Sequence, residues 1–243
     1  MCIRDRYIKS LKIAINHIIM KKRNFITGAS SLIFTGLYPV ISMAENASTY
    51  FSLIWRGLDV GFSNIKLKRS GKKITANIEV KISVKVLNFD AFSYNLKNEE
   101  IWEAGVLTKI KSKTIIGKKT EFVKGERKNK GFQIEGSKFS GLVKGNPATT
   151  SYFSPDFLKR KIWISTQDGD PLSVNASKIG PDMAKSVDGE IPATLWKISG
   201  DLDLDLLYGK DGKWLGSRFY AGGSQAEFLL KKSVGNMHSL WKV

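Results

Sequence analysis

Residues 74–86 alternate between apolar and polar side chains without a break. The apolar positions are Ile74, Ala76, Ile78, Val80, Ile82, Val84 and Val86, and each residue between them is Lys, Thr, Asn, Glu or Ser. Successive side chains of a β-strand point to opposite faces, whereas an amphipathic helix repeats its apolar positions every 3.6 residues. The run therefore predicts one long strand with a buried face and a solvated face.

Shorter segments of the same kind follow one another along the chain, and glycines stand at nearly every boundary between them. In chain order they are 49–56, 62–68, 89–97, 106–116, 119–125, 131–135, 138–144, 161–165, 172–176, 193–199, 201–208, 213–220 and 224–231. A dozen strands with short turns would expose long edges if the sheet stayed flat. We therefore predict an all-β protein, a single curved antiparallel meander that forms an open or incomplete β-barrel.

Two segments lack the alternating pattern. Residues 146–160 contain a proline and several aromatic side chains, and we expect a short irregular or helical segment there, dividing the strands into two groups. Residues 178–192 contain Gly, Pro and Asp, and they predict a mobile loop.

The pair Asp211-Gly212 is typical of a two-residue hairpin turn. Such a turn places Asp205 opposite Arg218 and Leu204 opposite Phe219. Charged side chains would then pair on one face of the hairpin, and apolar side chains would pair on the other.

The N-terminal region has the features of an export signal. A basic cluster, Lys21-Lys22-Arg23, precedes an uncharged stretch, 25–42, and Ser42-Met43-Ala44 places small residues where a signal peptidase reads them. The alternative is a permanent membrane anchor. The predicted organisation is an extension that is not native at 1–19, a signal peptide at 20–44, a β-rich domain at 45–233 and a C-terminal tail at 234–243. After cleavage near Ala44 the protein would be periplasmic, with membrane contact only through an uncleaved signal.

The chain is strongly basic, with 39 Lys and Arg residues against 22 Asp and Glu residues. Removal of residues 1–44 would leave 32 basic and 21 acidic residues. Such a surface favours anionic partners, and export makes an anionic envelope polymer or a lipid head group a better candidate than nucleic acid. The candidate contact residues are Lys118, Lys119, Arg127, Lys128, Lys159 and Arg160. The alternative is an ordinary solvated lysine surface.

Few residues are available for nucleophilic or metal chemistry. The chain has one Cys and two His, and cleavage would leave only His238. This composition excludes disulfide scaffolds, thiol nucleophiles, Cys-containing zinc sites and multi-His metal centres in the exported part. Phosphate-binding glycine motifs are also missing from the sequence. We therefore expect no cofactor and no bound metal.

Carboxylates give the only basis for an enzymatic hypothesis. Asp201, Asp203 and Asp205 lie on one face of a predicted strand, and Glu100 and Glu103 flank Trp102. A pair of carboxylates with different pKa values is the usual requirement of a hydrolase. The alternative is that these acids are solvated and face basic side chains, and we expect no catalytic residues.

Aromatic side chains are more numerous than the turns require, at 11% of the chain. In a curved sheet they either fill the interior or line a cavity. The leading hypothesis is a non-enzymatic periplasmic protein that binds a hydrophobic or amphiphilic ligand such as a lipid. An envelope interaction module with a basic surface comes second and a carboxylate-based hydrolase third. The candidate ligand-lining residues are Ile74, Ile78, Val80, Ile82, Val84, Trp102, Tyr152, Phe153, Trp196 and Phe219.

The order of several short motifs adds a resemblance. The motifs are Val84 to Tyr94, Glu100-x-Trp102-x-x-Gly105-x-Leu107, Thr149-Thr150-Ser151-Tyr152 with Pro155, and Gly200-Asp201-Leu202-Asp203-Leu204-x-x-x-Tyr208-x-x-x-Gly212. Together they resemble a family of exported bacterial proteins known only as a domain of unknown function, over roughly residues 50 to 230. Leu207 departs from the pattern, where the family has Trp. The resemblance implies a signal-bearing, β-rich, periplasmic protein, and it supplies no catalytic residues.

Overall fold

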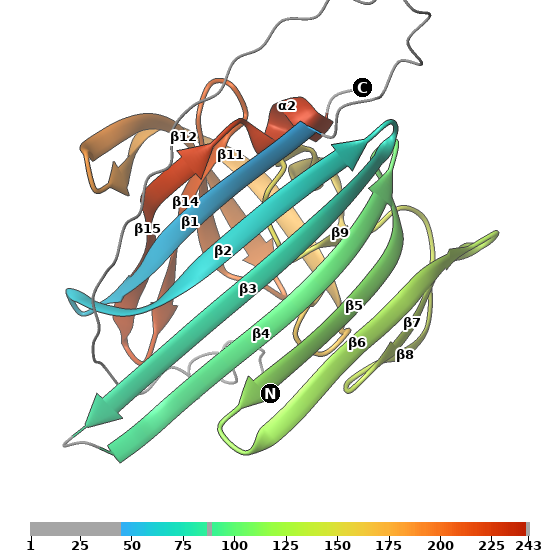
Figure 1. The fold of residues 1–243 in the computed structure, drawn as a ribbon, viewed down its shortest axis with the longest axis horizontal. Helices are drawn as coiled ribbons and strands as arrows, with labels where there is room; N and C mark the ends of the chain where they lie inside the picture. Colours follow the sequence, from blue (N-terminus) through green and yellow to red (C-terminus); the bar gives the residue numbers. More distant parts are fainter. Residues whose placement is uncertain (1–44, 87–88, 242–243) are drawn as a thin grey trace, which may run out of the picture.

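The computed structural model describes residues 45–86 and 89–241, and these residues form one sheet (Figure 1). The strands are β1 (Glu45–Trp55), β2 (Leu58–Ser70), β3 (Lys73–Val86), β4 (Phe89–Glu103), β5 (Val106–Ile116), β6 (Lys119–Lys128), β7 (Gly131–Gly136), β8 (Ser140–Val143), β9 (Ala148–Thr149), β10 (Ile162–Ile164), β11 (Pro171–Ser186), β12 (Gly189–Gly200), β13 (Leu204–Tyr208), β14 (Trp214–Ala221) and β15 (Ser224–Val234). A 3₁₀ helix, η1 (Pro155–Lys159), and a short helix, α2 (Met237–Trp241), complete the fold. The predicted extension and signal peptide, residues 1–44, lie outside the described residues.

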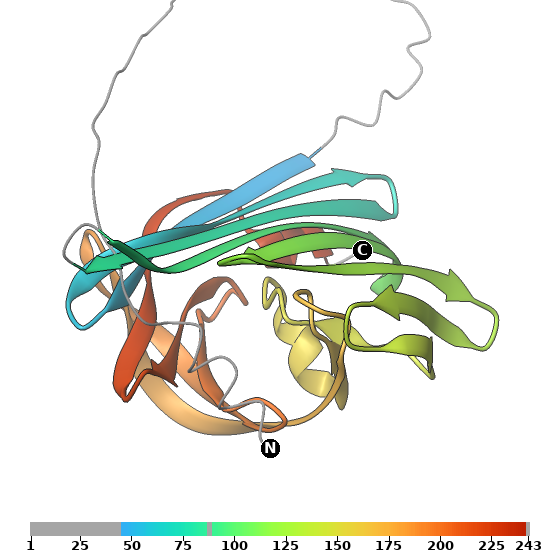
Figure 2. The ribbon, with the colours of Figure 1, turned by 90° about the horizontal axis from the view of Figure 1, so that it is seen from below.

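The strand order is β8-β7-β6-β5-β4-β3-β2-β1-β15-β14-β13-β12-β11-β10-β9, so the first and last long strands pair in the middle of the sheet. Figure 2 shows β1–β6 as one broad layer, with β11–β15 curling beneath it. A parallel contact between Ser186 of β11 and Leu230 of β15 gives the second layer a ring-like closure. The sheet as a whole stays open, with β8 and β9 at its ends. The predicted all-β, curved and incompletely closed architecture is confirmed.

The alternating run forms β3, at the centre of the broad layer. Ile74, Ala76, Ile78, Ile82 and Val84 are buried, and β3 pairs along its whole length with β2 and β4. Their apolar side chains face the second layer because the period of two places all of them on one side of the strand. The core of the molecule therefore lies between the two layers.

Residues 146–160 form an irregular segment with one short helical element, as the sequence predicts. The Ser154 hydroxyl caps η1 by accepting a hydrogen bond from the Asp156 amide, and Pro155 occupies the first turn. Figure 2 shows η1 beneath the broad layer, and its Phe157 stacks on Trp102 of β4 with 5.0 Å between ring centroids. The segment closes one end of the space between the layers.

The prediction of a mobile loop at 178–192 is wrong, because these residues belong to the β11–β12 hairpin. Pro181 lies opposite Thr194 and Met183 lies opposite Pro192, and a bulge at Ile179 interrupts the ladder. Exposure alternates along residues 179–184, but the less exposed face carries Gly180 and Asp182, whereas Ile179 and Met183 are exposed. The apolar side chains therefore do not follow the less exposed face, and the sequence gives no signal of period two.

For the hairpin between β13 and β14, the predicted turn is wrong but the predicted register is correct. The connection is longer than two residues, since the Gly209 amide donates to the Lys213 carbonyl at 2.9 Å. A bulge at Leu215 compensates for the added length, and Asp205 lies opposite Arg218 as predicted. Classic bulges place two residues opposite one, and in this way they restore the register.

Residues 236–241, which the sequence assigns to a C-terminal tail, form a turn and α2. Met237, Leu240 and Trp241 are buried, and the Trp241 ring packs against Trp102 at 5.0 Å. The indole of Trp241 also lies 5.4 Å from Phe157. Apolar burial against the core, rather than helix propensity, holds this five-residue helix in place.

Candidate ligand cavity

A cavity of about 480 Å³ lies between the two layers of the sheet. Its lining residues come from both layers and from the segments that follow β9, β10 and β12. They are Ser63, Ile65, Ile78, Val80, Ile82, Phe92, Tyr94, Leu96, Thr150, Ser151, Tyr152, Thr166, Gln167, Ser199, Gly200, Asp201, Leu202, Asp203, Leu204, Trp214, Ser217, Phe219, Tyr220 and Phe228. The cavity therefore depends on the pairing of distant parts of the chain.

Two opposite walls of the cavity are apolar, and one of them is mainly aromatic. The inward side chains of β2, β3 and β4 face Trp214 and Phe219 of β14 and Phe228 of β15. Trp214 and Phe228 are packed together at 5.9 Å, and Phe219 lies 6.1 Å from Phe228. Aromatic rings on paired strands form a rigid surface, and such surfaces bind apolar ligands.

The end of the cavity near β9 is polar. Thr150 and Thr166 are joined through their hydroxyl groups at 3.0 Å, and the Thr166 amide donates to the Thr150 hydroxyl at 3.1 Å. Gln167 donates its amide to the buried carboxylate of Glu121 at 2.7 Å. These bonds fix the polar side chains, so this end of the cavity is preorganised.

Ser151 connects the polar end to a buried carboxyl group. Glu100 of β4 is completely buried, and its Oε2 accepts hydrogen bonds from Trp102 Nε1 at 2.8 Å, Thr149 Oγ1 at 3.2 Å and Ser151 Oγ at 3.3 Å. Its Oε1 accepts from Asn98 Nδ2 at 2.8 Å. Burial raises the pKa of Glu100, and the four donors oppose that rise. This group ties β4 to the segment that carries Ser151.

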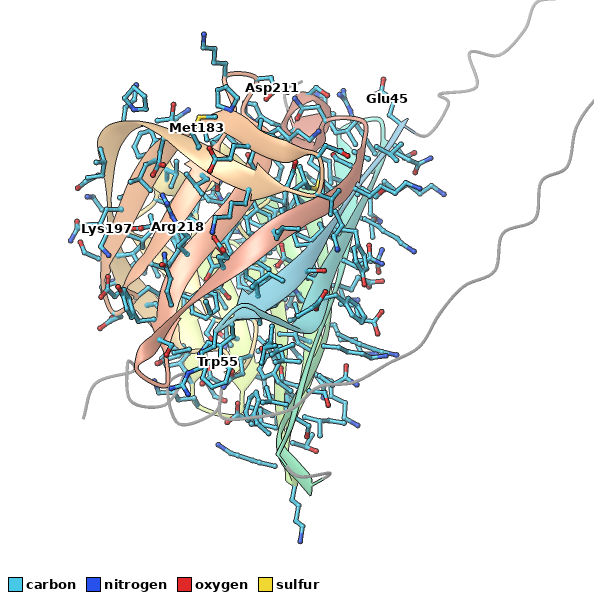
Figure 3. All side chains as sticks on the ribbon, turned by 90° about the vertical axis from the view of Figure 1, so that its left-hand side faces the viewer. Glu45, Trp55, Met183, Lys197, Asp211 and Arg218 are labelled. Atoms are coloured by element: carbon cyan, nitrogen blue, oxygen red, sulfur yellow. The ribbon has the colours of Figure 1, made fainter. Side chains whose placement is uncertain are left out.

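A second polar region surrounds the loop between β12 and β13. Asp201 accepts the Ser173 amide at 2.9 Å, and Asp203 pairs with Lys197 at 2.6 Å. Lys197 also lies 3.6 Å from Asp205, which faces Arg218. Figure 3 shows Lys197 and Arg218 close together on the outer face of this layer. Asp203 and Asp205 therefore contact basic side chains, as expected if they are solvated acids rather than catalytic groups.

The structure divides the predicted ligand-lining residues into two groups. Ile78, Val80, Ile82, Tyr152 and Phe219 line the cavity. The others lie outside its lining: Ile74, Trp102 and Phe153 are buried in the main core, Val84 is buried in a smaller cluster, and Trp196 packs on the edge of the main core. The residues outside the lining follow the same inward-facing pattern, but other core side chains separate them from the cavity.

The predicted anionic-surface residues do not form one site. Arg127 donates to the carbonyls of Leu107 and Gly145, and Arg160 donates to those of Pro147 and Gly105. Arg160 also stacks over Trp102 at 5.3 Å, and burial lowers its pKa to about 10. The lysines are exposed: Lys119 pairs with Glu121, Lys128 with Glu126 and Lys159 with Asp156, and Lys118 lies in the β5–β6 turn.

Both arginines hold the irregular segment against the sheet. Arg127 donates three hydrogen bonds and Arg160 donates two to protein acceptors, so both guanidinium groups have a structural role.

The remaining candidates for chemistry lie away from the cavity lining. Glu103 is exposed at the end of β4, and His238 is buried in α2 with its Nδ1 3.5 Å from the Ser154 hydroxyl. Within residues 45–86 and 89–241, no group of three or more His, Asp or Glu side chains is placed to bind a metal ion.

Most of the polar lining was not predicted from the sequence. Thr166 and Gln167 lie in the turn between β10 and β11, and no pattern in the sequence marks them. Thr150 and Ser151 belong to one of the motifs that carry the family resemblance, and that motif was the available signal.

The fold and the cavity define a β-barrel-like protein with a cavity between its two layers. A β-barrel-like protein from Brucella abortus, crystallised as a domain of unknown function (DUF1849), has the same fold with a TM-score of 0.54 at 9% identity. The match covers 78% of this chain and 97% of that one. Residues 51–231 match the family described as a domain of unknown function (DUF6134), and the chain belongs to that family. The curated proteins include none that matches it. The helices described by the structure are all too short or too polar to cross a bilayer.

Proposed function

We propose that this protein binds a hydrophobic or amphiphilic ligand in the cavity between its two layers, acting as an exported, periplasmic binding protein. The observation that carries the proposal is the cavity itself, whose 480 Å³ lies within the usual range of about 300 to 1,000 Å³ for small-molecule sites. A filled core would leave no such space, because protein interiors pack to the density of organic crystals.

The lining supports an apolar ligand with a polar group. Ile65, Ile78 and Leu96 lie on one wall, and Trp214 and Phe228 belong to the opposite one. The hydroxyl and amide groups of the lining residues lie at the ends of the cavity. Such a division matches the division of an amphiphile into a chain and a head group.

Fluorescence titration with N-phenyl-1-naphthylamine, a neutral apolar probe, tests the proposal on residues 45–243. Saturable binding with about one site per chain is expected. Val80→Trp places an indole in the cavity and should abolish that binding, whereas Val234→Trp, at an exposed strand end, should leave it unchanged. Equal binding by both variants, or no saturable binding to the wild type, would overturn the proposal. Native mass spectrometry of periplasmic material identifies any lipid that copurifies.

A second function has one specific observation in its favour. On the outer face of the broad layer Lys97 lies opposite Lys113, and Lys111 lies opposite Lys124, all four exposed. Like charges placed opposite each other on a sheet are destabilising, so an anionic polymer bound there would relieve a repulsion. Retention on immobilised heparin should fall with salt and with the pair Lys111→Glu and Lys113→Glu, but not with Lys210→Glu in a distant turn. Equal retention of all variants would contradict this second function.

A further inference from the structure

The charged side chains that line the cavity are negative, whereas the chain as a whole has an excess of positive charge. The charged residues among its described lining are Asp201 and Asp203, and neither lysine nor arginine belongs to that lining. Around this loop, Asp182, Asp201, Asp203 and Asp205 stand against Lys197 and Arg218. The region keeps an excess of negative charge although the chain is strongly basic.

Hydrogen-bond acceptors also lie directly behind the polar end. Ser151, on the cavity wall, contacts Glu100, which has no ion-pair partner among the described residues. Asn98 is buried, and its Oδ1 has no hydrogen-bond partner among the described residues. Asn98 pairs with Ile78, a lining residue of β3, and lies behind the lining rather than in it.

A buried acceptor without a donor is unfavourable, so acceptors at this end of the cavity favour a ligand that donates hydrogen bonds. Hydroxyl and ammonium groups donate hydrogen bonds, whereas a carboxylate only accepts them. A carboxylate or phosphate head group would meet Asp201, which has no ion-pair partner among the described residues, and no lysine or arginine belongs to the lining to balance its charge. Asp203 already pairs with Lys197, so the repulsion comes from Asp201, and it disfavours such a ligand.

We infer that the cavity selects amphiphiles whose head group donates hydrogen bonds and carries no negative charge, and that the head group is held at the polar end beside Ser151. The inference rests on the proposed function and deepens it. It names the class of ligand as long-chain alcohols and amines, and it excludes free fatty acids.

Three ligands with the same chain test the inference: dodecan-1-ol, dodecylamine and dodecanoate, each below its micellar concentration at neutral pH. Displacement of N-phenyl-1-naphthylamine from the wild-type protein gives their relative affinities. The alcohol and the amine are expected to bind about tenfold or more tightly than the carboxylate, a factor worth roughly 1.4 kcal/mol. Comparison of the alcohol with the amine separates hydrogen bonding from attraction of a positive charge.

Two variants assign the preference to named groups. Asp201→Asn keeps an oxygen that accepts the Ser173 amide and removes the charge, so it should strengthen dodecanoate binding, weaken dodecylamine binding and leave dodecan-1-ol unchanged. Asp188→Asn, in the exposed β11–β12 turn, is the matched control and should change none of the three. Ser151→Ala should weaken the alcohol and the amine about three- to tenfold while the apolar probe still binds.

The outcomes separate the two proposals. Failure of the probe to bind overturns ligand binding itself. Probe binding with equal displacement by all three ligands, or with preference for dodecanoate, keeps ligand binding and overturns the selectivity. A preference for the alcohol and the amine that survives both Asp201→Asn and Ser151→Ala overturns the assignment to these residues.

Discussion

Glu100 is the buried acid that accepts hydrogen bonds from four side chains behind the polar end of the cavity. Its carboxyl group accepts bonds from Asn98, Trp102, Thr149 and Ser151, and these donors come from β4 and from the segment at β9. Arg160, at the end of the irregular segment, packs over the ring of the same tryptophan. A single acid therefore orients the cavity wall that carries Ser151.

Removal of this acceptor should be strongly destabilising. Glu100→Ala leaves the Asn98 and Trp102 donors and one of the Thr149 and Ser151 hydroxyl groups without an acceptor, since these two hydroxyl groups also bond to each other at 2.6 Å. We expect a loss of about 3 kcal/mol or more in the free energy of unfolding, measured by urea denaturation. Glu100→Gln should lose much less, because the Asn98 amide can reverse and present its free Oδ1 to the new amide group. Similar losses for the two variants would contradict the role given to the hydrogen bonds.

The raised pKa of Glu100 gives the stability a pH dependence with a definite sign. Burial is the cause of the rise from the ordinary value of 4.5, so the folded state binds the proton more tightly than the unfolded state. The contribution of this group is therefore fully present below about pH 4.5 and is lost as the pH rises through the folded pKa. Relative to Glu100→Gln, the wild type should lose stability over that interval. If the difference between the unfolding free energies of the wild type and Glu100→Gln did not change with pH, the predicted pH dependence would be wrong.

Among the elements, the end of β12 determines the shape of the loop with Asp201. Gly200 has φ = +104°, and a Cβ atom at this position would lie 2.5 Å from the Ser173 carbonyl oxygen. The Asp201 amide donates to that same oxygen at 2.9 Å. A side chain at position 200 is thus opposed both by the backbone conformation and by the neighbouring strand.

Gly200→Ala should therefore destabilise the protein by about 1–3 kcal/mol and weaken binding of the apolar probe, since residues 199–204 line the cavity. Gly180→Ala is the matched control, because it has φ = +148° and no neighbour within 4 Å of the added Cβ. Thermal unfolding measures the first effect and probe titration the second. Equal effects at both positions would show that backbone conformation alone, without the contact to Ser173, is responsible.

At the scale of the whole molecule, the pairing of β1 with β15 joins the two layers. The pairs run from Ser48–Val234 to Trp55–Ala226, and α2 packs at one end of this seam. These contacts connect residues at opposite ends of the described chain. Contacts of such high sequence separation form late and slow down folding.

Loss of the seam should prevent folding of the whole domain. A chain that ends at Gly222 lacks β15 and α2, and it exposes β1 and β14 as open edges. We expect it to aggregate and to lose the cooperative thermal transition, as measured by size-exclusion chromatography and circular dichroism. A chain that ends at Val234 lacks only α2 and should fold with reduced stability. A soluble, cooperative fold without β15 would contradict the role of the seam.

The sequence by itself determined the sheet, its antiparallel meander and the buried face of each regular strand. The reason is local: a period of two in residues 74–86 specifies both a strand and its inward face. The predicted Asp205–Arg218 register is correct only because the bulge at Leu215 offsets the longer turn, which the sequence did not reveal. The sequence also did not reveal strand structure at 178–192, because Gly180 and Asp182 lie on the less exposed face of β11 while Ile179 and Met183 are exposed.

Only the tertiary structure decided which inward residues line a cavity and which are covered. Ile74 and Ile78 share one strand face, yet α2 and η1 contribute to the core around Trp102 at one end of the layer and leave space further along β3. The polar end arises where β4 meets residues 149–151 and 166–167, which are distant along the chain. Hydrophobic pattern specifies a side of a strand, and packing of remote segments specifies what covers it.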